Sequence, residues 1–223
     1  MDAPTILLST YIPEALRACP PLARYATPWH MAAHAAEVVR ALLPTLGAEF
    51  AVTDEVAVHR TASVEAGAVV RGPAILGRNC AVAAHAYLRD GVFLDDGARI
   101  GPSCEVKASF LFRGAVLAHL NYAGNSLIGS AVNVEAGAVL ANHWNERDGK
   151  EIAVMLAECP VMTGVEKFGA LVGDGVRIGA NAVTSPGTLL LPRSVVGRLT
   201  LVDQVAQYEA RQRDAGVIES HSH

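Results

Sequence analysis

Aliphatic side chains recur every six residues through the middle of the chain. The series starts at Val58 and continues through Val64, Val70, Leu76, Val82, Leu88, Leu94, Ile100, Val106 and Phe112. The position four residues later in each hexad is apolar and mostly small: Ala62, Ala68, Ala74, Cys80, Ala86, Val92, Ala98, Cys104 and Phe110. A period of six matches neither the 3.6 of a helix nor the two of a simple strand. It predicts an all-β solenoid, a parallel β-helix in which each hexad is one short strand and a corner.

Three hexads close one coil of about 18 residues, and successive coils stack at about 4.8 Å. Apolar residues make up 51% of the chain but aromatic residues only 5%, so small side chains must fill the interior. Such a composition suits a narrow, tightly wound prism. The corners have turn residues, as in Asp90-Gly91 and Asp96-Gly97, which tolerate unusual backbone angles.

The period is interrupted after Phe112 and again after Asn142, and it returns at Val172. We expect the charged segment between the last two to be an inserted loop. Before the hexads, Thr27-Pro28 has the pattern of a helix N-cap followed by proline, which predicts a helix to about Leu43. The expected units are a helical N-terminal segment (1–50), the β-helix (51–199, with the insert at about 143–168), and a C-terminal helix and tail (200–223).

The net charge of −4 and the absence of a long basic run argue against binding to nucleic acid or an anionic membrane. No apolar run approaches the roughly 18 residues of a membrane span. The four cysteines have no metal-binding spacing, and Cys80 and Cys104 fall on inward positions, where we expect small hydrophobic side chains. A short N-terminal apolar run without preceding basic residues is not typical of a signal peptide, so we expect a cytoplasmic protein.

The run from His119 to Asn142 (HLNYAGNSLIGSAVNVEAGAVLAN) resembles the acetyltransferase domain of the bifunctional enzymes that make UDP-N-acetylglucosamine. Leu88-Arg89-Asp90-Gly91, Glu105-Val106-Lys107 and Lys167-Phe168 resemble further motifs of that family. The resemblance covers about residues 58–198. It implies a left-handed β-helix, a homotrimer, acetyl-CoA as cosubstrate and no metal.

The same resemblance implies a role for individual side chains. His119 would be the general base that takes a proton from the sugar amine, since a histidine with a pKa of about 6.5 is largely unprotonated near neutrality. Asn142 and Glu105 would orient the reacting groups. The remaining residues would bind the two substrates: Arg89, Lys107, Tyr122, Asn133 and Lys167 the sugar phosphate, Ala136 and Ala180 the acetyl-CoA.

Two departures from the family keep other functions open. The chain shows no glycine-rich nucleotide-binding loop followed by lysine, so we do not expect uridylyl transfer. The family's Asn-Tyr pair is replaced by Asn142-His143, followed by an insert beside the expected sugar pocket. With this change, the resemblance implies an acceptor that is either an amino-sugar phosphate or a nucleotide-linked amino sugar. The alternative function is a non-catalytic trimer that binds a sugar phosphate or nucleotide sugar, or acts as a scaffold.

A zinc enzyme like the γ-class carbonic anhydrases is a third hypothesis. His85, His119 and His143 are not spaced by whole coils, which argues against it. His30 and His34 share a predicted helix face but lack an HExxH motif, and a pair of this kind is more often a packing or surface feature.

Overall fold

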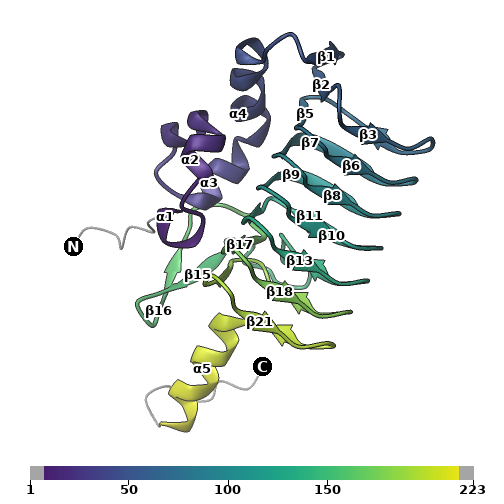
Figure 1. Ribbon diagram of the computed structural model, residues 1–223. Helices are drawn as coiled ribbons and strands as arrows, with labels where there is room; N and C mark the ends of the chain where they lie inside the picture. Colours follow the sequence, from purple (N-terminus) through teal and green to yellow (C-terminus); the bar gives the residue numbers. More distant parts are fainter. Residues whose placement is uncertain (1–7, 216–223) are drawn as a thin grey trace.

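The six-residue period forms a parallel β-solenoid (Figure 1). A computed structural model describes residues 8–215. Strands of successive coils pair in parallel throughout. The exceptions are β1 (Phe50–Thr53), which pairs antiparallel with β2 (Val56–His59) at the N-terminal end, and one inserted hairpin. The predicted parallel β-helix is confirmed.

The solenoid has three faces. The first face contains β2 (Val56–His59), β5 (Ala74–Leu76), the C-terminal halves of β7 (Tyr87–Leu94) and β9 (Glu105–Leu111), β12 (Leu127–Ile128), β17 (Ala170–Val172) and β20 (Thr188–Leu190). The second face is a seven-stranded sheet of β3 (Ser63–Val64), β6 (Ala81–Val82), β8 (Arg99–Ile100), β10 (Val116–Leu117), β13 (Asn133–Val134), β18 (Arg177–Ile178) and β21 (Val195–Val196). The third face contains β4 (Val69–Val70), the N-terminal halves of β7 and β9, β11 (Tyr122–Gly124), β14 (Val139–Leu140), β19 (Val183–Thr184) and β22 (Leu201–Val202).

The coils change length along the chain. Leu76 pairs with Leu94, 18 residues on, whereas Leu94 pairs with Leu111, 17 residues on. The register shifts at the corner between β7's two halves, where β9 has the single residue Ala108, at φ 48°, opposite two residues of β7. Leu111 therefore points into the prism with the other aliphatic residues.

The prediction that Phe110 and Phe112 occupy inward hexad positions is wrong. Both are buried, at 0% and 1% exposed, but they belong to a separate apolar cluster outside the prism. The corner at Ala108 has one residue fewer than the corresponding corner of β7. This shifts Phe110 and Phe112 onto the opposite side of the strand, because successive side chains alternate between the two sides. Their large rings then pack where the narrow interior has no room for them.

Helices from the N-terminal segment cover the first face (Figure 1). They are α1 (Leu8–Tyr11), α2 (Ala15–Ala18), α3 (Pro28–Ala33) and α4 (Ala35–Leu42), with short 3-10 helices at Pro20–Arg24 and Leu43–Thr45. Thr27 caps α3 by accepting from the backbone N–H of His30 at 3.5 Å, as its N-cap pattern predicts. The single helix expected to reach Leu43 is instead broken at His34.

The helices bury an outward-facing column of apolar side chains on the first face, including Phe93, Phe110 and Leu127. Gly91 allows α4 to approach, since a Cβ there would collide with the backbone of Ala35 and Ala36. Its φ of +98° also favours glycine. The first face is thus occupied by the chain itself, which leaves the second and third faces for other contacts.

The insert is partly ordered as a hairpin of β15 (Ala153–Leu156) and β16 (Cys159–Met162), not as an irregular loop. It leaves the solenoid after Asn142 and returns at Phe168, whose backbone N–H donates to the Asn142 carbonyl at 3.0 Å. Ile152, Val154 and Trp144 bury the inner side of the insert against the same cluster as the helices.

The last coil is followed by α5 (Gln204–Asp214), within the range predicted for the C-terminal helix. Asp203 caps this helix by accepting from the Ala206 N–H. The tail expected after it lies beyond the described residues. Within residues 8–215, none of the helices has the length and apolar character to cross a membrane.

Candidate functional site

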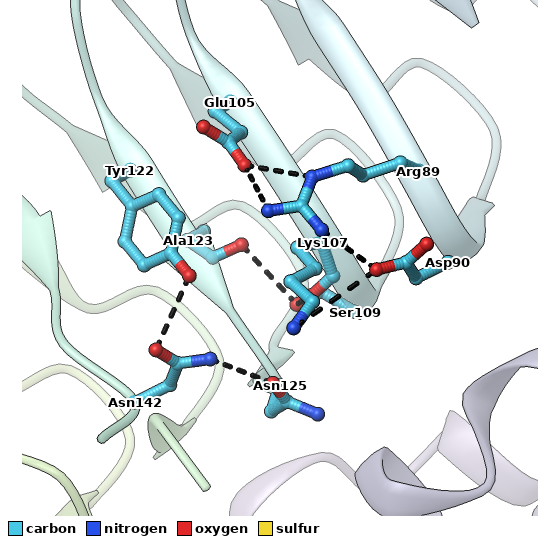
Figure 2. A network of polar contacts seen from close by, with 9 residues as sticks. All are labelled: Arg89, Asp90, Glu105, Lys107, Ser109, Tyr122, Ala123, Asn125 and Asn142. Atoms are coloured by element: carbon cyan, nitrogen blue, oxygen red, sulfur yellow. Dashed lines mark hydrogen bonds and ion pairs between the residues drawn. The ribbon is translucent and has the colours of Figure 1, made fainter. Parts of the chain in front are cut away.

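The third face has a cluster of charged and polar side chains near the insert. Parallel pairing aligns Arg89 of β7 with Lys107 of β9, and Lys107 with Gly124 of β11. The same register aligns Glu105 with Tyr122. Because paired residues on parallel strands point to the same side, these side chains form adjacent columns on one surface. Figure 2 shows them with Asp90 and Asn142.

Arg89 is the centre of the charged part of the cluster (Figure 2). Its Nε and Nη2 donate to one oxygen of Glu105 at 2.9 and 2.7 Å, and its Nη1 donates to Asp90 at 2.7 Å. Lys107 Nζ lies 4.0 Å from the same oxygen of Asp90. The carboxylate of Asp90 is therefore shared between two cations, while its side chain is 53% exposed.

The environment of Lys107 disfavours its positive charge. Its side chain is only 17% exposed. Burial lowers the pKa of its ammonium group, and the positive charges of Lys167 and Arg89 lower it further, against the opposing effect of Asp90 and Glu105. The charges of Arg89 and the exposed Lys167 thus act on the little-exposed Lys107, and such a group of cations favours binding of an anion.

Tyr122 and Asn142 form the polar part of the cluster. The Tyr122 hydroxyl donates to Asn142 Oδ1 at 3.2 Å, and Asn142 Nδ2 donates to Asn125 Oδ1 at 2.7 Å. Burial raises the pKa of the Tyr122 phenol, with a smaller contribution from the charge of Glu105, so the hydroxyl keeps its proton and acts as donor. These two contacts fix the orientation of the Asn142 amide and leave it one N–H and one lone pair for a ligand.

The remaining predicted site residues lie along a different part of the solenoid. His119 is exposed at the corner before β11, and Ala136 and Ala180 occupy the same corner in the following coils, as the backbone bonds Gly137 N to His119 O and Asn181 N to Ala136 O show. Asn133 is exposed on the second face. Within residues 8–215, no hydrogen bond or ion pair links His119 to the Arg89–Asn142 cluster.

Lys167 lies beside the cluster because the insert returns there. It precedes the buried Phe168, whose backbone is bonded to Asn142. Two cluster members were not selected from the sequence, Asp90 and Asn125. Both have a left-handed backbone, with φ of 64° and 46°. Their position at corners next to Arg89 and Gly124 was the available signal, but corner Asp and Asn residues are common for backbone reasons alone.

Metal binding has no support in the part of the chain that the structure describes, where no group of three or more His, Cys, Asp or Glu side chains could hold an ion. His34 stacks on Tyr25 with ring centroids 4.6 Å apart, and its Nδ1 bonds to the His30 carbonyl. The His30/His34 pair is therefore explained by local packing. All four cysteines are free, and Cys80 and Cys104 are buried as predicted.

The coil register and the face-by-face alternation define the chain as a hexapeptide-repeat parallel β-solenoid. Three of its curated relatives are bifunctional proteins. It is 32% identical over 125 residues to the bifunctional protein GlmU of Methanococcus maripaludis, covering 56% of this chain and 30% of the relative. The bifunctional sugar-1-phosphate nucleotidylyltransferase/acetyltransferase of Sulfurisphaera tokodaii is 36% identical over 120 residues, covering 51% and 29%. GlmU of Pseudoalteromonas atlantica is 30% identical over 159 residues, covering 69% and 31%.

The chain thus spans less than a third of the length of these relatives, and the resemblance seen in the sequence is confirmed over that segment. No family model matches the chain. Among solved structures, a hexapeptide transferase family protein of Anaplasma phagocytophilum aligns at a TM-score of 0.39 and 12% identity, over 71% of this chain and 87% of the other. A mutant of AntD, an N-acyltransferase of Bacillus cereus in complex with dTDP and coenzyme A, aligns at 0.34 and 15%, over 66% and 70%.

Proposed function

We propose that the chain transfers an acetyl group from acetyl-CoA to the amine of an amino sugar that carries a phosphate. The acceptor is either an amino-sugar phosphate or a nucleotide-linked amino sugar. The observation that carries the proposal is the convergence of Arg89, Lys107 and Lys167 beside the oriented Tyr122–Asn142 pair. The names of the sequence relatives, which include a sugar-1-phosphate nucleotidylyltransferase/acetyltransferase, support the same chemistry.

The cations would bind the phosphate of the acceptor. Two nitrogens of Arg89 are held by Glu105, so Glu105 fixes the direction of the guanidinium group. The third guanidinium nitrogen of Arg89 and the Lys107 ammonium share the exposed carboxylate of Asp90. A phosphate that replaces Asp90 would bring more negative charge to the same two donors and relieve their repulsion with Lys167.

The acyl transfer itself needs a neutral amine and a proton acceptor. The amine nitrogen attacks the thioester carbonyl, the new C–N bond forms as the C–S bond breaks, and coenzyme A leaves as the thiolate and then takes up a proton. An imidazole would accept the proton that the nitrogen loses. His119 is our candidate for this base, and Asn142 for the group that orients the amine or the carbonyl oxygen.

His119 lies outside the cluster of its own chain, so in this proposal it acts on the cluster of a neighbouring copy. A trimer that packs through the uncovered faces would bring the corner of one copy, with His119, Ala136 and Ala180, and its second face, with Asn133, against the third face of the next. Acetyl-CoA would then lie along the corner, where the two alanines leave room for it.

The position of His119 away from the Arg89–Asn142 cluster favours one alternative function. In it, the chain is a binding or scaffolding protein that holds the sugar phosphate without catalysis. Incubation with acetyl-CoA and glucosamine 1-phosphate or UDP-glucosamine, followed by measurement of free thiol, distinguishes the two. Thiol release that requires the amino sugar, and that falls in Lys107→Met but not in Arg193→Ala, supports transfer. Binding of the sugar phosphate with no thiol release from any amino sugar would establish the alternative.

A further inference from the structure

A second pocket lies on the third face, directly beyond Asn142. Its floor includes Val183 and Leu201, which are paired on successive strands, and Ala141, which follows β14. Its wall is formed by the insert, from His143 to Arg147. The floor strands continue the columns that hold the cluster, so the pocket and the cluster share one surface. The hexads alone do not build this pocket, because its wall consists of inserted residues.

The neutral form of His143 would present one unprotonated nitrogen in this pocket. Its Nδ1 lies 3.0 Å from the backbone carbonyl of Glu166, which can only accept a hydrogen bond. The proton of the neutral imidazole is therefore on Nδ1, and Nε2 is an acceptor. Within residues 8–215, no side chain or backbone group donates to that nitrogen. It is available to an N–H or O–H of a ligand.

Arg147 presents a flat surface in the same pocket. Its guanidinium group lies over the Trp144 ring, 3.4 Å from the ring centroid, while the Trp144 side chain is 9% exposed. Its side chain is 44% exposed, so part of the guanidinium group is accessible to a ligand. The charge of Arg147 is partly offset by Asp203, 3.9 Å away. A guanidinium plane of this kind stacks well on a planar aromatic ring.

We infer that this pocket binds a nucleobase linked to the phosphate of the acceptor. The base would stack on the accessible part of the Arg147 guanidinium group above the apolar floor and donate an N–H to Nε2 of His143. The inference rests on the proposed function and narrows it, because it makes the acceptor a nucleotide-linked amino sugar. An amino-sugar phosphate fills the cationic cluster but leaves this pocket empty.

The experiment compares ligands that differ only in the base. Calorimetric titration of the full chain with uridine diphosphate, adenosine diphosphate and inorganic pyrophosphate separates base binding from binding of the phosphates. We expect at least one nucleotide to bind about tenfold or more tightly than pyrophosphate, the range expected from one stacking contact and one hydrogen bond. Arg147→Lys, which keeps the charge but loses the plane, and His143→Phe, which keeps the ring but loses both nitrogens, should each remove most of that difference. Pyrophosphate binding should stay unchanged.

The matched controls are Arg193→Ala and His85→Ala, an exposed arginine and an exposed histidine at other corners, which should leave every affinity unchanged. Nucleotides that bind no better than pyrophosphate would overturn the inference, as would Arg147→Lys and His143→Phe variants with unchanged nucleotide preference. Thiol release with acetyl-CoA is measured separately. Nucleotide preference without thiol release refutes the proposed function and leaves the pocket assignment intact, and thiol release without nucleotide preference does the reverse.

Discussion

Replacement of Lys107 by methionine should have opposite effects on stability and on phosphate binding. Methionine keeps an unbranched side chain of similar length but removes the charge. Lys107 is 17% exposed and its pKa is lowered, first by burial and then by Lys167 and Arg89, so its charge is unfavourable in the folded protein without ligand. We expect Lys107→Met to unfold at the same or a slightly higher urea concentration, with a gain in unfolding free energy of up to about 1 kcal/mol.

The same substitution should weaken phosphate binding strongly. A hydrogen bond to a charged group contributes about 1.5–3 kcal/mol, and the low exposure of Lys107 favours the upper part of that range. A loss of about 2–3 kcal/mol corresponds to a roughly 30- to 150-fold weaker affinity for glucosamine 1-phosphate, measured by calorimetry. A matched loss in kcat/KM should follow. A variant that unfolds more easily than the wild type and still binds the phosphate normally would refute this reasoning.

The difference in stability between wild type and Lys107→Met should depend on pH. In the unfolded chain the lysine titrates near 10.5, and in the folded protein below that value. Between the two pKa values the unfolded state binds more protons, so the stability of the wild type rises with pH relative to the variant. The advantage of the variant is therefore complete below the folded pKa and is lost as pH approaches 10.5. An advantage that does not change over this range would show that the buried ammonium charge is not its cause.

Three further substitutions or labels test other parts of the structure. Phe110→Ala should lower the free energy of unfolding by about 3–5 kcal/mol in a urea titration, because the ring fills the layer between the first face and the helices; a loss below about 1 kcal/mol would place the ring outside that layer. Tyr122→Phe removes the donor to Asn142 Oδ1 and should lower kcat/KM about 3- to 10-fold with little loss of secondary structure, whereas unchanged kinetics would separate the pair from the reaction. A thiol reagent should label Cys159 rapidly in the folded protein, and rapid labelling of more than one thiol would contradict the burial of the others: Cys19, Cys80 and Cys104. Burial raises the pKa of the Cys80 thiol to about 12, which slows its reaction further.

The sequence predicts the solenoid well because a period of six is visible in single residues. Inward positions such as Leu88 and Val106 must be apolar in every coil, so the repeat needs no long-range information. The period also places Arg89 above Lys107, since both occupy the same hexad position 18 residues apart. The inward residues of the solenoid and the alignment of Arg89 with Lys107 can therefore be predicted from the six-residue period alone.

The prediction from the sequence is wrong where a corner has one residue fewer than the six-residue period requires. The corner at Ala108 is one residue shorter than its predecessor, and this turns Phe110 and Phe112 outward. A continuous apolar pattern on both sides of the strand hides such a shift, since Leu111 is as suitable for the interior as Phe112. The hairpin in the insert was also missed, because its turn at Ala157 and Glu158 contains neither glycine nor asparagine, although both residues have positive φ.

The site was only partly predictable for a related reason. Stacking on successive coils brings Arg89, Lys107, Tyr122 and Asn142 onto one face, and the return of the insert adds Lys167. His119 belongs to a corner, and its distance from the cluster of a neighbouring copy depends on how copies pack, which the period of one chain does not encode. The pocket with His143 and Arg147 depends on the path of the insert, which has no repeat.

Crystal structures of the full chain with coenzyme A and either glucosamine 1-phosphate or UDP-glucosamine test the central claim most directly. The account predicts that phosphate oxygens lie within hydrogen-bond distance of Arg89 and Lys107 in place of the Asp90 carboxylate, with the amine facing Asn142. A phosphate bound elsewhere would contradict it, for example at the corner pocket lined by Arg177 and Arg198 or at the end pocket lined by Arg60 and Arg78.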